Sequence, residues 1–314
     1  MGYVTTLVYM KQSLRIWLDA ARPKTLPLAL VSILTGSVLA FSSHHFSWMV
    51  AFLSFLTATL LQILSNLAND YGDAVKGTDN HQRLGPMRAI QSGAVTPKVM
   101  MQAIVINIVL TMLAGLTLVL YALTSWHSIL IFIGLGVLAI AAAIAYTVGN
   151  KPYGYVGLGD VSVFIFFGLL GVAGTYFLHT GIVDFSLALP AIGCGLLAVA
   201  VLNVNNMRDI ENDKECGKHT VAVRLGQKRA KQYHFVLLGG ALLAFVCYLF
   251  LQPSPLWFSL PFLISAIVVY KHGKAVWLAE KPAQIAPMMP VVVKCSLVTN
   301  ILFAGVVIAQ TLVS

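Results

Sequence analysis

Apolar stretches of about 17 to 25 residues, the length of a membrane-spanning helix, recur along the whole chain and constrain its fold more than any other feature. A helix of this length crosses a hydrocarbon core roughly 30 Å thick. The chain has 314 residues, of which 58% are hydrophobic and only 10% are charged. An ordinary soluble domain carries roughly 25% charged residues, because its surface needs polar cover. The sequence therefore predicts a polytopic integral membrane protein and argues against a soluble helical fold.

Nine stretches are predicted to cross the membrane as helices, because a span in lipid has to satisfy its own backbone hydrogen bonds. Their predicted ranges are Thr25–Phe41, Phe46–Leu67, Val99–Leu123, Ile129–Tyr146, Asp160–Phe177, Phe185–Val204, Phe235–Leu251, Leu256–Tyr270 and Met289–Leu312. The eighth is the weakest candidate, because it is short and contains Pro261. No Gly/Ser-rich linker divides the chain, so we expect an all-α bundle of about nine transmembrane helices that forms a single domain over residues 1–314.

The positions of the basic residues predict which ends of the spans face the cytoplasm. The formal net charge is +9, and every Lys and Arg lies in the N-terminal arm, in the regions that follow spans two, four and six, or in the region from Lys271 to Lys294 around the start of span nine. The alternate connections, near His44, Trp126, Thr180 and Pro253, contain none. This is the positive-inside pattern of nine spans with a cytoplasmic N-terminus. We therefore attribute the basic balance to membrane orientation and interpret residues 1–24 as a cytoplasmic amphipathic arm without a cleavable signal.

Most of the acidic residues lie in two polar connections. Seven of the eleven Asp and Glu residues follow spans two and six, on the same predicted face of the membrane. In the second connection Asn205, Asp209 and Asp213 are spaced four residues apart, which would put them on one face of a helix. Because the two connections open with similar residues four spans apart, the sequence suggests a weak internal repeat with two facing helix groups.

The first connection predicts a similar cluster at the end of a helix. Asn66, Asn69 and Asp73 share a helical face, and Gly77 is expected to end the helix before Asp79. Stacked like charges repel, so carboxylates placed this way need a cation. Oxygen ligands without His or Cys select Mg²⁺ or a similar ion, which is commonly shared with substrate phosphate. The alternative interpretation is that these are solvated loop acids.

Basic residues beside the acids are candidates for binding diphosphate oxygens. The four that we expect in this role are Arg88, Lys151, Arg208 and Lys214. Lys151 stands out because it is the only charge in its short connection. Anchoring of the spans at the cytoplasmic surface is the alternative role for most of these residues.

The spans are otherwise apolar and rich in aromatic residues, as a groove for a long isoprenoid chain would have to be. Most of these aromatic side chains are expected to pack or to face lipid. Tyr146, at the cytoplasmic end of span four, is a candidate catalytic residue whose ring would face a cationic intermediate.

Taken together, the spans and the two Asp-rich motifs resemble the UbiA-type intramembrane aromatic prenyltransferases. That family carries Asn-x₃-Asp with a further Asp in the first motif, and Asp-x₃-Asp in the second. The resemblance implies that Mg²⁺ is held by Asn69, Asp73 and Asp79 and by Asp209 and Asp213, with Asn205 preceding them.

The long gap from Asp73 to Asp79 resembles the branch of that family that uses 1,4-dihydroxy-2-naphthoate in menaquinone biosynthesis. Further stretches are similar to the same branch, so that the resemblance covers almost the whole chain: Ala21–Pro27, Gly85–Arg88 with Gln91 and Gly93, Tyr146–Asp160 and Asn205–Asp209.

The resemblance implies a membrane-embedded transferase of prenyl groups. Mg²⁺ and the two motifs would bind a polyprenyl diphosphate, whose ionisation gives an allylic cation that the naphthoate ring attacks. The carboxylate would leave as CO₂, giving demethylmenaquinone. Asp70 is a candidate for the base that activates the ring. The expected location is the bacterial cell (inner) membrane, with the active site cytoplasmic, with membrane lipid as a partner and without nucleic acid.

Two other functions are compatible with parts of the pattern. A related prenyltransferase would use 4-hydroxybenzoate or homogentisate as the aromatic acceptor. A divalent-cation transporter would also need carboxylates, but deep within the spans. Here the spans are nearly free of acids, and Asp184 lies at the opposite rim from the two motifs.

Overall fold

The computed structural model describes residues 14–313, in which every regular element is a helix, as predicted. The longer helices are α2 (Pro27–Ser42), α3 (Trp48–Val75), α4 (Pro97–Ala122), α5 (Trp126–Ala145), α8 (Ala188–Arg208), α10 (Val221–Leu251), α11 (Leu263–Leu278) and α13 (Met288–Val313). The elements α6 (Gly159–Val163), η2 (Phe164–Gly174) and α7 (Thr175–Thr180) run on as one helix. The short elements are η1 (Tyr153–Val156), η3 (Phe185–Leu187), α9 (Ile210–Glu215), η4 (Leu256–Phe262) and α12 (Pro282–Ile285).

Seven helices among the described residues are long and apolar enough to cross a membrane, which bears out the prediction of a multi-pass membrane protein. The other two predicted spans are also helical, but their helices are shorter. Helix α2 has 16 residues and begins at Pro27, and α11 has 16 residues and follows η4, which contains Pro261. Proline lacks the backbone N–H that would extend an α-helix toward the N-terminus, which accounts for both late starts. The count of nine spans stays a prediction.

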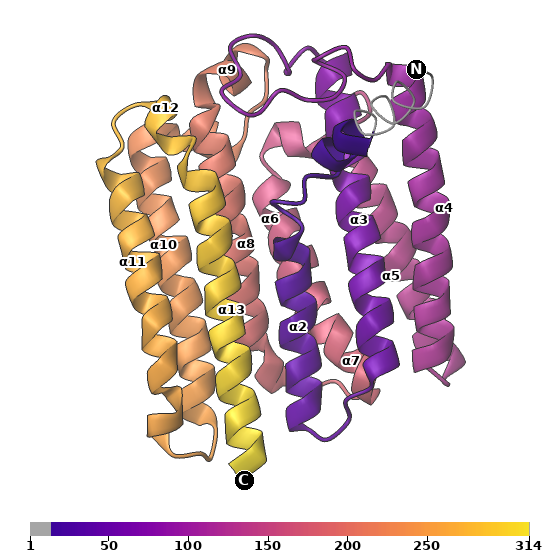
Figure 1. The fold of residues 1–314 in the computed structure, drawn as a ribbon, viewed down its shortest axis with the longest axis vertical. Helices are drawn as coiled ribbons and strands as arrows, with labels where there is room; N and C mark the ends of the chain where they lie inside the picture. The colour runs from indigo at the N-terminus through magenta and orange to yellow at the C-terminus, as the bar shows by residue number, and fades with distance from the viewer. Residues whose placement is uncertain (1–13, 314) are drawn as a thin grey trace, which may run out of the picture.

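The long helices stand side by side and form two groups (Figure 1). Helices α8, α10, α11 and α13 lie on one side, and α3, α4 and α5 lie on the other, with α2 and the α6–η2–α7 helix between them. The groups join where α8 packs on η2 and α13 packs on α2. Two facing groups are consistent with the arrangement that the sequence repeat suggested.

A buried polar cluster ties α2, α8 and α13 together inside the bundle. The side-chain oxygen of Asn300 accepts hydrogen bonds from the Thr35 hydroxyl (2.9 Å) and from the Cys194 thiol (2.9 Å). In lipid such interhelical hydrogen bonds stabilise packing that apolar contacts alone do not specify.

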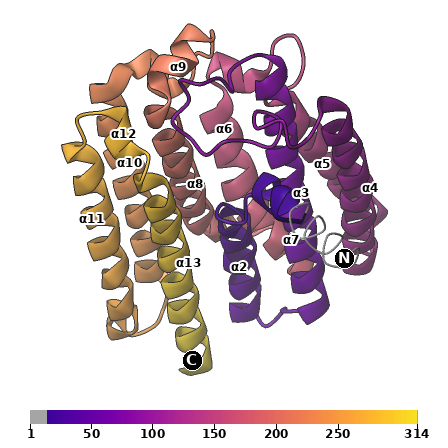
Figure 2. The same cartoon turned by 45° about the horizontal axis from the view of Figure 1, so that its top comes forward.

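The polar connections gather at one end of the bundle. The long loop after α3, helix α9 and helix α12 all lie at this end, while the C-terminal end of α13 lies at the other (Figures 1 and 2). The two Asp-rich motifs therefore share one face of the molecule, as the sequence predicted.

The N-terminal arm packs against the same end of α3. Residues 14–21 are helical, and Ala20 is buried against Leu64 and Leu67 of α3. The side-chain amide of Asn66 donates to the Ala21 carbonyl at 2.8 Å. The rest of the predicted arm, residues 1–13, lies outside the described residues.

Candidate active site

The first motif sits where α3 ends at the polar face. The helix stops at Val75, and Gly77 adopts a φ of +73°, a left-handed conformation that favours glycine. The chain then turns back, so that the backbone N–H of Thr78 donates to the Asp73 carbonyl at 3.0 Å. The helix therefore ends before Asp79, as predicted, and this aspartate folds back toward the end of α3.

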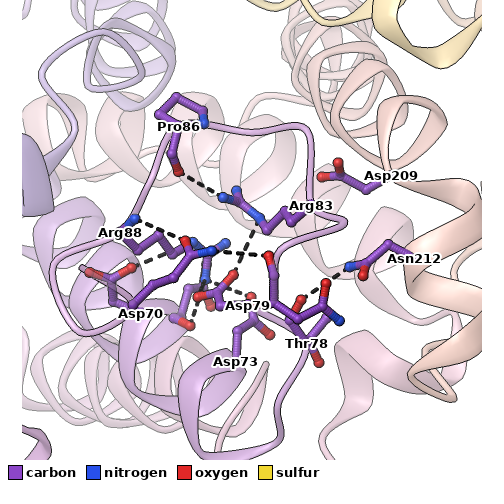
Figure 3. Close-up of polar contacts among 12 residues, drawn as sticks. Asp70, Asp73, Thr78, Asp79, Arg83, Pro86, Arg88, Asp209 and Asn212 are labelled. Carbon is purple, nitrogen blue, oxygen red and sulfur yellow. Dashed lines mark hydrogen bonds and ion pairs between the residues drawn. The ribbon is translucent and has the colours of Figure 1, made fainter. Parts of the chain in front are cut away.

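Arg88 is the centre of the first cluster (Figure 3). Its Nη1 lies 2.7 Å from an Asp73 carboxylate oxygen and 3.0 Å from one of Asp79, and its Nε lies 3.5 Å from Asp70. Burial disfavours the charged guanidinium, but the three carboxylates outweigh burial and raise the pKa of Arg88. Burial also raises the pKa of Asp79, against the opposing effect of Arg88. One buried guanidinium thus serves as the counter-ion of three carboxylates.

Asp73 has two further partners that come from distant parts of the chain. The Tyr155 hydroxyl donates to Asp73 at 2.7 Å and lies 2.6 Å from the Thr78 hydroxyl. Burial and the nearby Asp73 raise the pKa of Tyr155, which keeps it protonated as a donor. The Lys218 ammonium lies 3.9 Å from Asp73 and 3.9 Å from Asp213. Lys218 therefore links the two motifs electrostatically.

The second motif departs from the single helical face that its spacing predicted. Helix α8 ends at Arg208, Asp209 takes a non-helical conformation with φ −108° and ψ 16°, and α9 starts at the next residue. The buried Arg208 guanidinium contacts the Asp209 carboxylate, with Nε and Oδ1 3.1 Å apart. Adjacent residues of a regular helix point in different directions. The direct contact between Arg208 and Asp209 is therefore accompanied by a break in the helix between α8 and α9.

The two motifs contact each other directly. The side-chain amide of Asn212 donates to the Thr78 carbonyl at 3.0 Å, as Figure 3 shows. Asp209 lies on the same side of the cluster as Asn212, across from Asp70 (Figure 3). Burial raises the pKa of Asp213 to about 6, with Lys218 acting in the opposite direction. The two motifs thus meet at one polar cluster, through Asn212 and through Lys218.

A cavity of about 660 Å³ opens from this polar end into the bundle. Its polar lining at this end includes Arg22, Asn69, Asp73, Arg88, Asn205 and Lys218. Farther in, its walls become apolar, with Leu116, Phe132, Leu135, Phe166, Phe167 and Leu170. The cavity therefore combines an anion-binding end with an apolar channel that suits a hydrocarbon chain.

Tyr146 lines this cavity, where it packs against glycines. A Cβ atom at Gly154 would lie 2.6 Å from the Tyr146 carbonyl oxygen, and one at Gly159 would lie 2.9 Å from its hydroxyl. The ring also meets the Tyr153 ring edge to face, with centroids 5.3 Å apart. Larger residues at either glycine would displace the ring, so the local sequence positions it at the cavity wall.

Five of the twelve predicted site residues line the cavity and seven do not. Asp79, Arg208, Asp209 and Asp213 lie in the polar cluster of the two motifs but not in the cavity lining, and the lining also lacks Asp70, Lys151 and Lys214. Asp70 is buried and faces Arg22 and Arg88, while both lysines are exposed. The lysine that reaches the cavity is Lys218, which the sequence analysis missed. Its only signal was its place five residues after Asp213, beyond the turn at Gly217.

The donor atoms fit a magnesium ion that is shared with substrate. Within residues 14–313, no three acidic, His or Cys side chains are close enough to form a complete metal site. Both carboxylate oxygens of Asp79 and the side-chain oxygen of Asn212 are buried without a hydrogen bond. Mg²⁺ is usually held by one or two carboxylates together with phosphate oxygens and water. The site therefore has the ligand chemistry for a metal–diphosphate complex rather than a preformed metal cage.

Comparison with known proteins places these features in a family context. Residues 29–298 match the sequence profile of the UbiA prenyltransferase family. The chain is 48% identical over 295 residues to the 1,4-dihydroxy-2-naphthoate octaprenyltransferase of Escherichia coli, covering 94% of this chain and 96% of that protein. It is 46% identical to the Haemophilus influenzae protein of the same name, with the same coverage of each.

Solved structures share the fold at low sequence identity. A UbiA homologue from Aeropyrum pernix superposes with a TM-score of 0.65 at 16% identity, covering 90% of this chain and 97% of that chain. A UbiA homologue from Archaeoglobus fulgidus, solved with DMAPP and Mg²⁺, gives a TM-score of 0.59 at 14% identity, with coverages of 95% and 100%.

Proposed function

The chain belongs to the UbiA prenyltransferase family, and on that premise we propose that it transfers a polyprenyl group from a polyprenyl diphosphate to 1,4-dihydroxy-2-naphthoate. The transfer releases diphosphate and CO₂ and gives demethylmenaquinone, a precursor in menaquinone biosynthesis. The names of the two relatives at 46% and 48% identity support this choice of acceptor.

The single observation that carries the proposal is the junction of two oxygen-rich motifs at the mouth of an apolar cavity. Asp73, Lys218 and Asp213 form a continuous chain of contacts between the motifs. The cavity that begins there continues between apolar walls. A polyprenyl diphosphate is divided in the same way into a charged part and an apolar part, with a trianionic head and a hydrocarbon tail.

The side chains have separate tasks in this reaction. Arg88 and Lys218 would bind oxygens of the leaving diphosphate, because both line the cavity and both carry a cation there. The Tyr146 ring would face the allylic cation, which is attracted by the negative face of an aromatic ring. The apolar walls would hold the chain and exclude water, which would otherwise capture the cation.

We also propose that Mg²⁺ is held by the two motifs, through Asn69, Asp73 and Asp79 and through Asn205, Asp209 and Asp213. When bound, it would supply positive charge that stabilises the departing diphosphate. The structural relative that was solved with DMAPP and Mg²⁺ supports this choice of ion. The oxygen-only donor set supports it independently.

The proposal includes the setting of the enzyme. The chain would form one transmembrane domain in the bacterial inner membrane, with residues 1–24 as a cytoplasmic arm and with the motif end of the bundle in the cytoplasm. The basic residues concentrate on that side in the sequence, as the positive-inside rule requires.

The test is an assay of the purified protein in detergent or nanodiscs with Mg²⁺, a prenyl diphosphate and a panel of aromatic acids. We expect turnover of 1,4-dihydroxy-2-naphthoate well above that of 4-hydroxybenzoate and homogentisate. Clean turnover of 4-hydroxybenzoate without turnover of the naphthoate would move the acceptor to the alternative branch.

A further inference from the structure

The short helix η1 connects the two motifs at the polar end of the bundle, although it belongs to neither. The backbone carbonyl of Tyr155 in η1 accepts a hydrogen bond at 2.8 Å from the N–H of His219, which follows the second motif. The Arg224 guanidinium donates to the next carbonyl, that of Val156, at 2.7 Å. The backbone of η1 is thus held on the side of the second motif, while the buried side chain of Tyr155 contacts the first motif.

The Tyr155 hydroxyl holds one of the two carboxylate oxygens of Asp73. Oδ1 accepts a hydrogen bond from Tyr155 at 2.7 Å, and Oδ2 accepts one from Arg88 at 2.7 Å. The Thr78 hydroxyl lies 2.6 Å from the Tyr155 hydroxyl. Because a phenol has one hydrogen and Tyr155 donates it to Asp73, Thr78 donates its own hydrogen to the Tyr155 oxygen. The carboxylate is therefore held at both oxygens, and its orientation depends on a hydroxyl that is itself held in place.

The ring of Tyr155 contacts a second member of the site, Lys218. The Lys218 ammonium lies 5.2 Å from the ring centroid and 3.9 Å from Oδ1 of Asp73, the oxygen that also binds the Tyr155 hydroxyl. A cation at this distance over an aromatic ring is attracted to it, which limits the positions that a flexible lysine side chain can take. The hydroxyl and the ring of Tyr155 thus act on different residues, and substitutions can separate the two.

We propose that Tyr155 is a positioning residue of the metal–diphosphate site: its hydroxyl orients the Asp73 carboxylate as a metal ligand, and its ring holds Lys218 beside that carboxylate. The inference rests on the proposed function, since it takes Asp73 as a ligand of Mg²⁺. Tyr155 is not among the described residues that line the cavity, so it acts through Asp73 and Lys218 and not on the substrate. The competing interpretation is that Tyr155 only fastens η1 to the rest of the protein.

The test measures metal binding without turnover. Mn²⁺, which takes the same oxygen ligands as Mg²⁺, is titrated into the purified protein with a non-hydrolysable prenyl thiolodiphosphate present, and bound Mn²⁺ is followed by electron paramagnetic resonance. Tyr155→Phe removes the hydroxyl and keeps the ring. It should raise the dissociation constant of Mn²⁺ by about tenfold or more, which is the usual effect of removing a residue that orients a metal ligand. Saturating Mg²⁺ should restore most of kcat, because every group that touches the substrate is retained.

Three further variants separate the roles of the hydroxyl, the ring and the fold. Tyr155→Leu removes the ring as well, and it should also weaken binding of the thiolodiphosphate, because Lys218 loses the ring that holds it. Tyr233→Phe is the matched control, since the Tyr233 hydroxyl donates to a carboxylate, that of Asp160, outside the two motifs at 3.0 Å. It should leave the affinity for Mn²⁺ within about twofold of the parent. Thr78→Val keeps Tyr155 but removes the hydroxyl that holds it, and should weaken Mn²⁺ binding more than the control does.

The outcomes distinguish this inference from the proposed function. An affinity for Mn²⁺ within about twofold of the parent in Tyr155→Phe would overturn the inference and leave the proposed function standing. So would a loss of kcat that saturating Mg²⁺ does not restore, because that is the effect of a purely structural role. If thermal unfolding shows that Tyr155→Phe is not folded, Thr78→Val decides, and Mn²⁺ binding equal to that of Tyr233→Phe would overturn the inference. A parent protein that binds no Mn²⁺ with the thiolodiphosphate would contradict the proposed metal site itself.

Discussion

A nitrogen of the Arg88 guanidinium lies 2.7 Å from a carboxylate oxygen of Asp73, at the position where the first motif meets the cavity. The same guanidinium contacts Asp79 and Asp70. The protein therefore neutralises its own acids with an internal cation. A metal–diphosphate complex would bring a cation that can pair with these carboxylates and an anion that can pair with Arg88. Arg88 and the carboxylates could therefore exchange each other for the complex with little change in the net charge of the site.

Removing this internal cation should destabilise the metal-free protein. Arg88→Gln leaves three buried carboxylates without their shared partner, and breaking a buried ion pair typically costs about 3–5 kcal/mol. Thermal unfolding in detergent with a chelator should show a clear loss of stability, and Mg²⁺ should restore more stability in the variant than in the parent. Equal melting of parent and variant in chelator would show that Arg88 does not balance these acids.

The motif acids should be required for activity. Asp73→Asn and Asp209→Asn keep the side-chain shape but remove a hard anionic ligand, so prenyl transfer should fall by about 100-fold or more with folding intact. Asp184→Asn is the matched control, because Asp184 caps η3 at the other end of the bundle and Asn caps equally well. Near-normal turnover of both motif variants, or substantial activity in a chelator, would contradict the proposed role of the metal.

Three lysines, Lys218, Lys214 and Lys151, should differ in their effects on activity. Lys218→Gln removes the cation that lies 3.9 Å from both Asp73 and Asp213, and kcat/KM for the prenyl diphosphate should fall by about tenfold or more. Lys214→Gln and Lys151→Gln change exposed charges and should have effects of less than about threefold. A larger loss of kcat/KM in Lys214→Gln or Lys151→Gln than in Lys218→Gln would show that the exposed lysine binds the diphosphate, as the sequence predicted.

Membrane orientation can be measured independently of chemistry. A reporter inserted near Gly217 should report the cytoplasm, because the second motif lies among the basic connections. A reporter fused after Ser314 should report the opposite side, if the chain crosses the membrane nine times. Both reporters on one side of the membrane would contradict the nine-span topology.

The helices and the shared face of the motifs could be predicted from the sequence, because hydropathy and helical spacing are local properties. The end of α3 before Asp79 followed from Gly77 for the same reason. The break at Asp209 could not be predicted, since it accompanies the contact of that residue with the buried Arg208. Spacing alone shows which residues a regular helix would bring together and not where the helix stops being regular.

The residues that pair with the acids of the motifs could not be predicted from the sequence either. Tyr155 and Lys218 reach Asp73 from positions 82 and about 145 residues away, through loops whose paths depend on tertiary packing. The sequence predicts that Arg22 belongs to an interfacial arm, because the surrounding segment is basic and amphipathic. Its place in the cavity depends on the docking of that arm on α3 through Asn66. Basic residues on the cytoplasmic side serve both anchoring and binding, and their position in the chain does not separate the two roles.

The most direct test of the central claim follows the carboxylate of the acceptor. In the proposed reaction the new carbon–carbon bond forms at the carbon that carries the carboxylate, so prenyl transfer and loss of CO₂ must be coupled. With carboxyl-labelled 1,4-dihydroxy-2-naphthoate and a prenyl diphosphate, labelled CO₂ should appear in a one-to-one ratio with the prenylated product. It should appear only when the prenyl donor is present. Label that remains in the prenylated product, or CO₂ release without the donor, would contradict the proposed reaction.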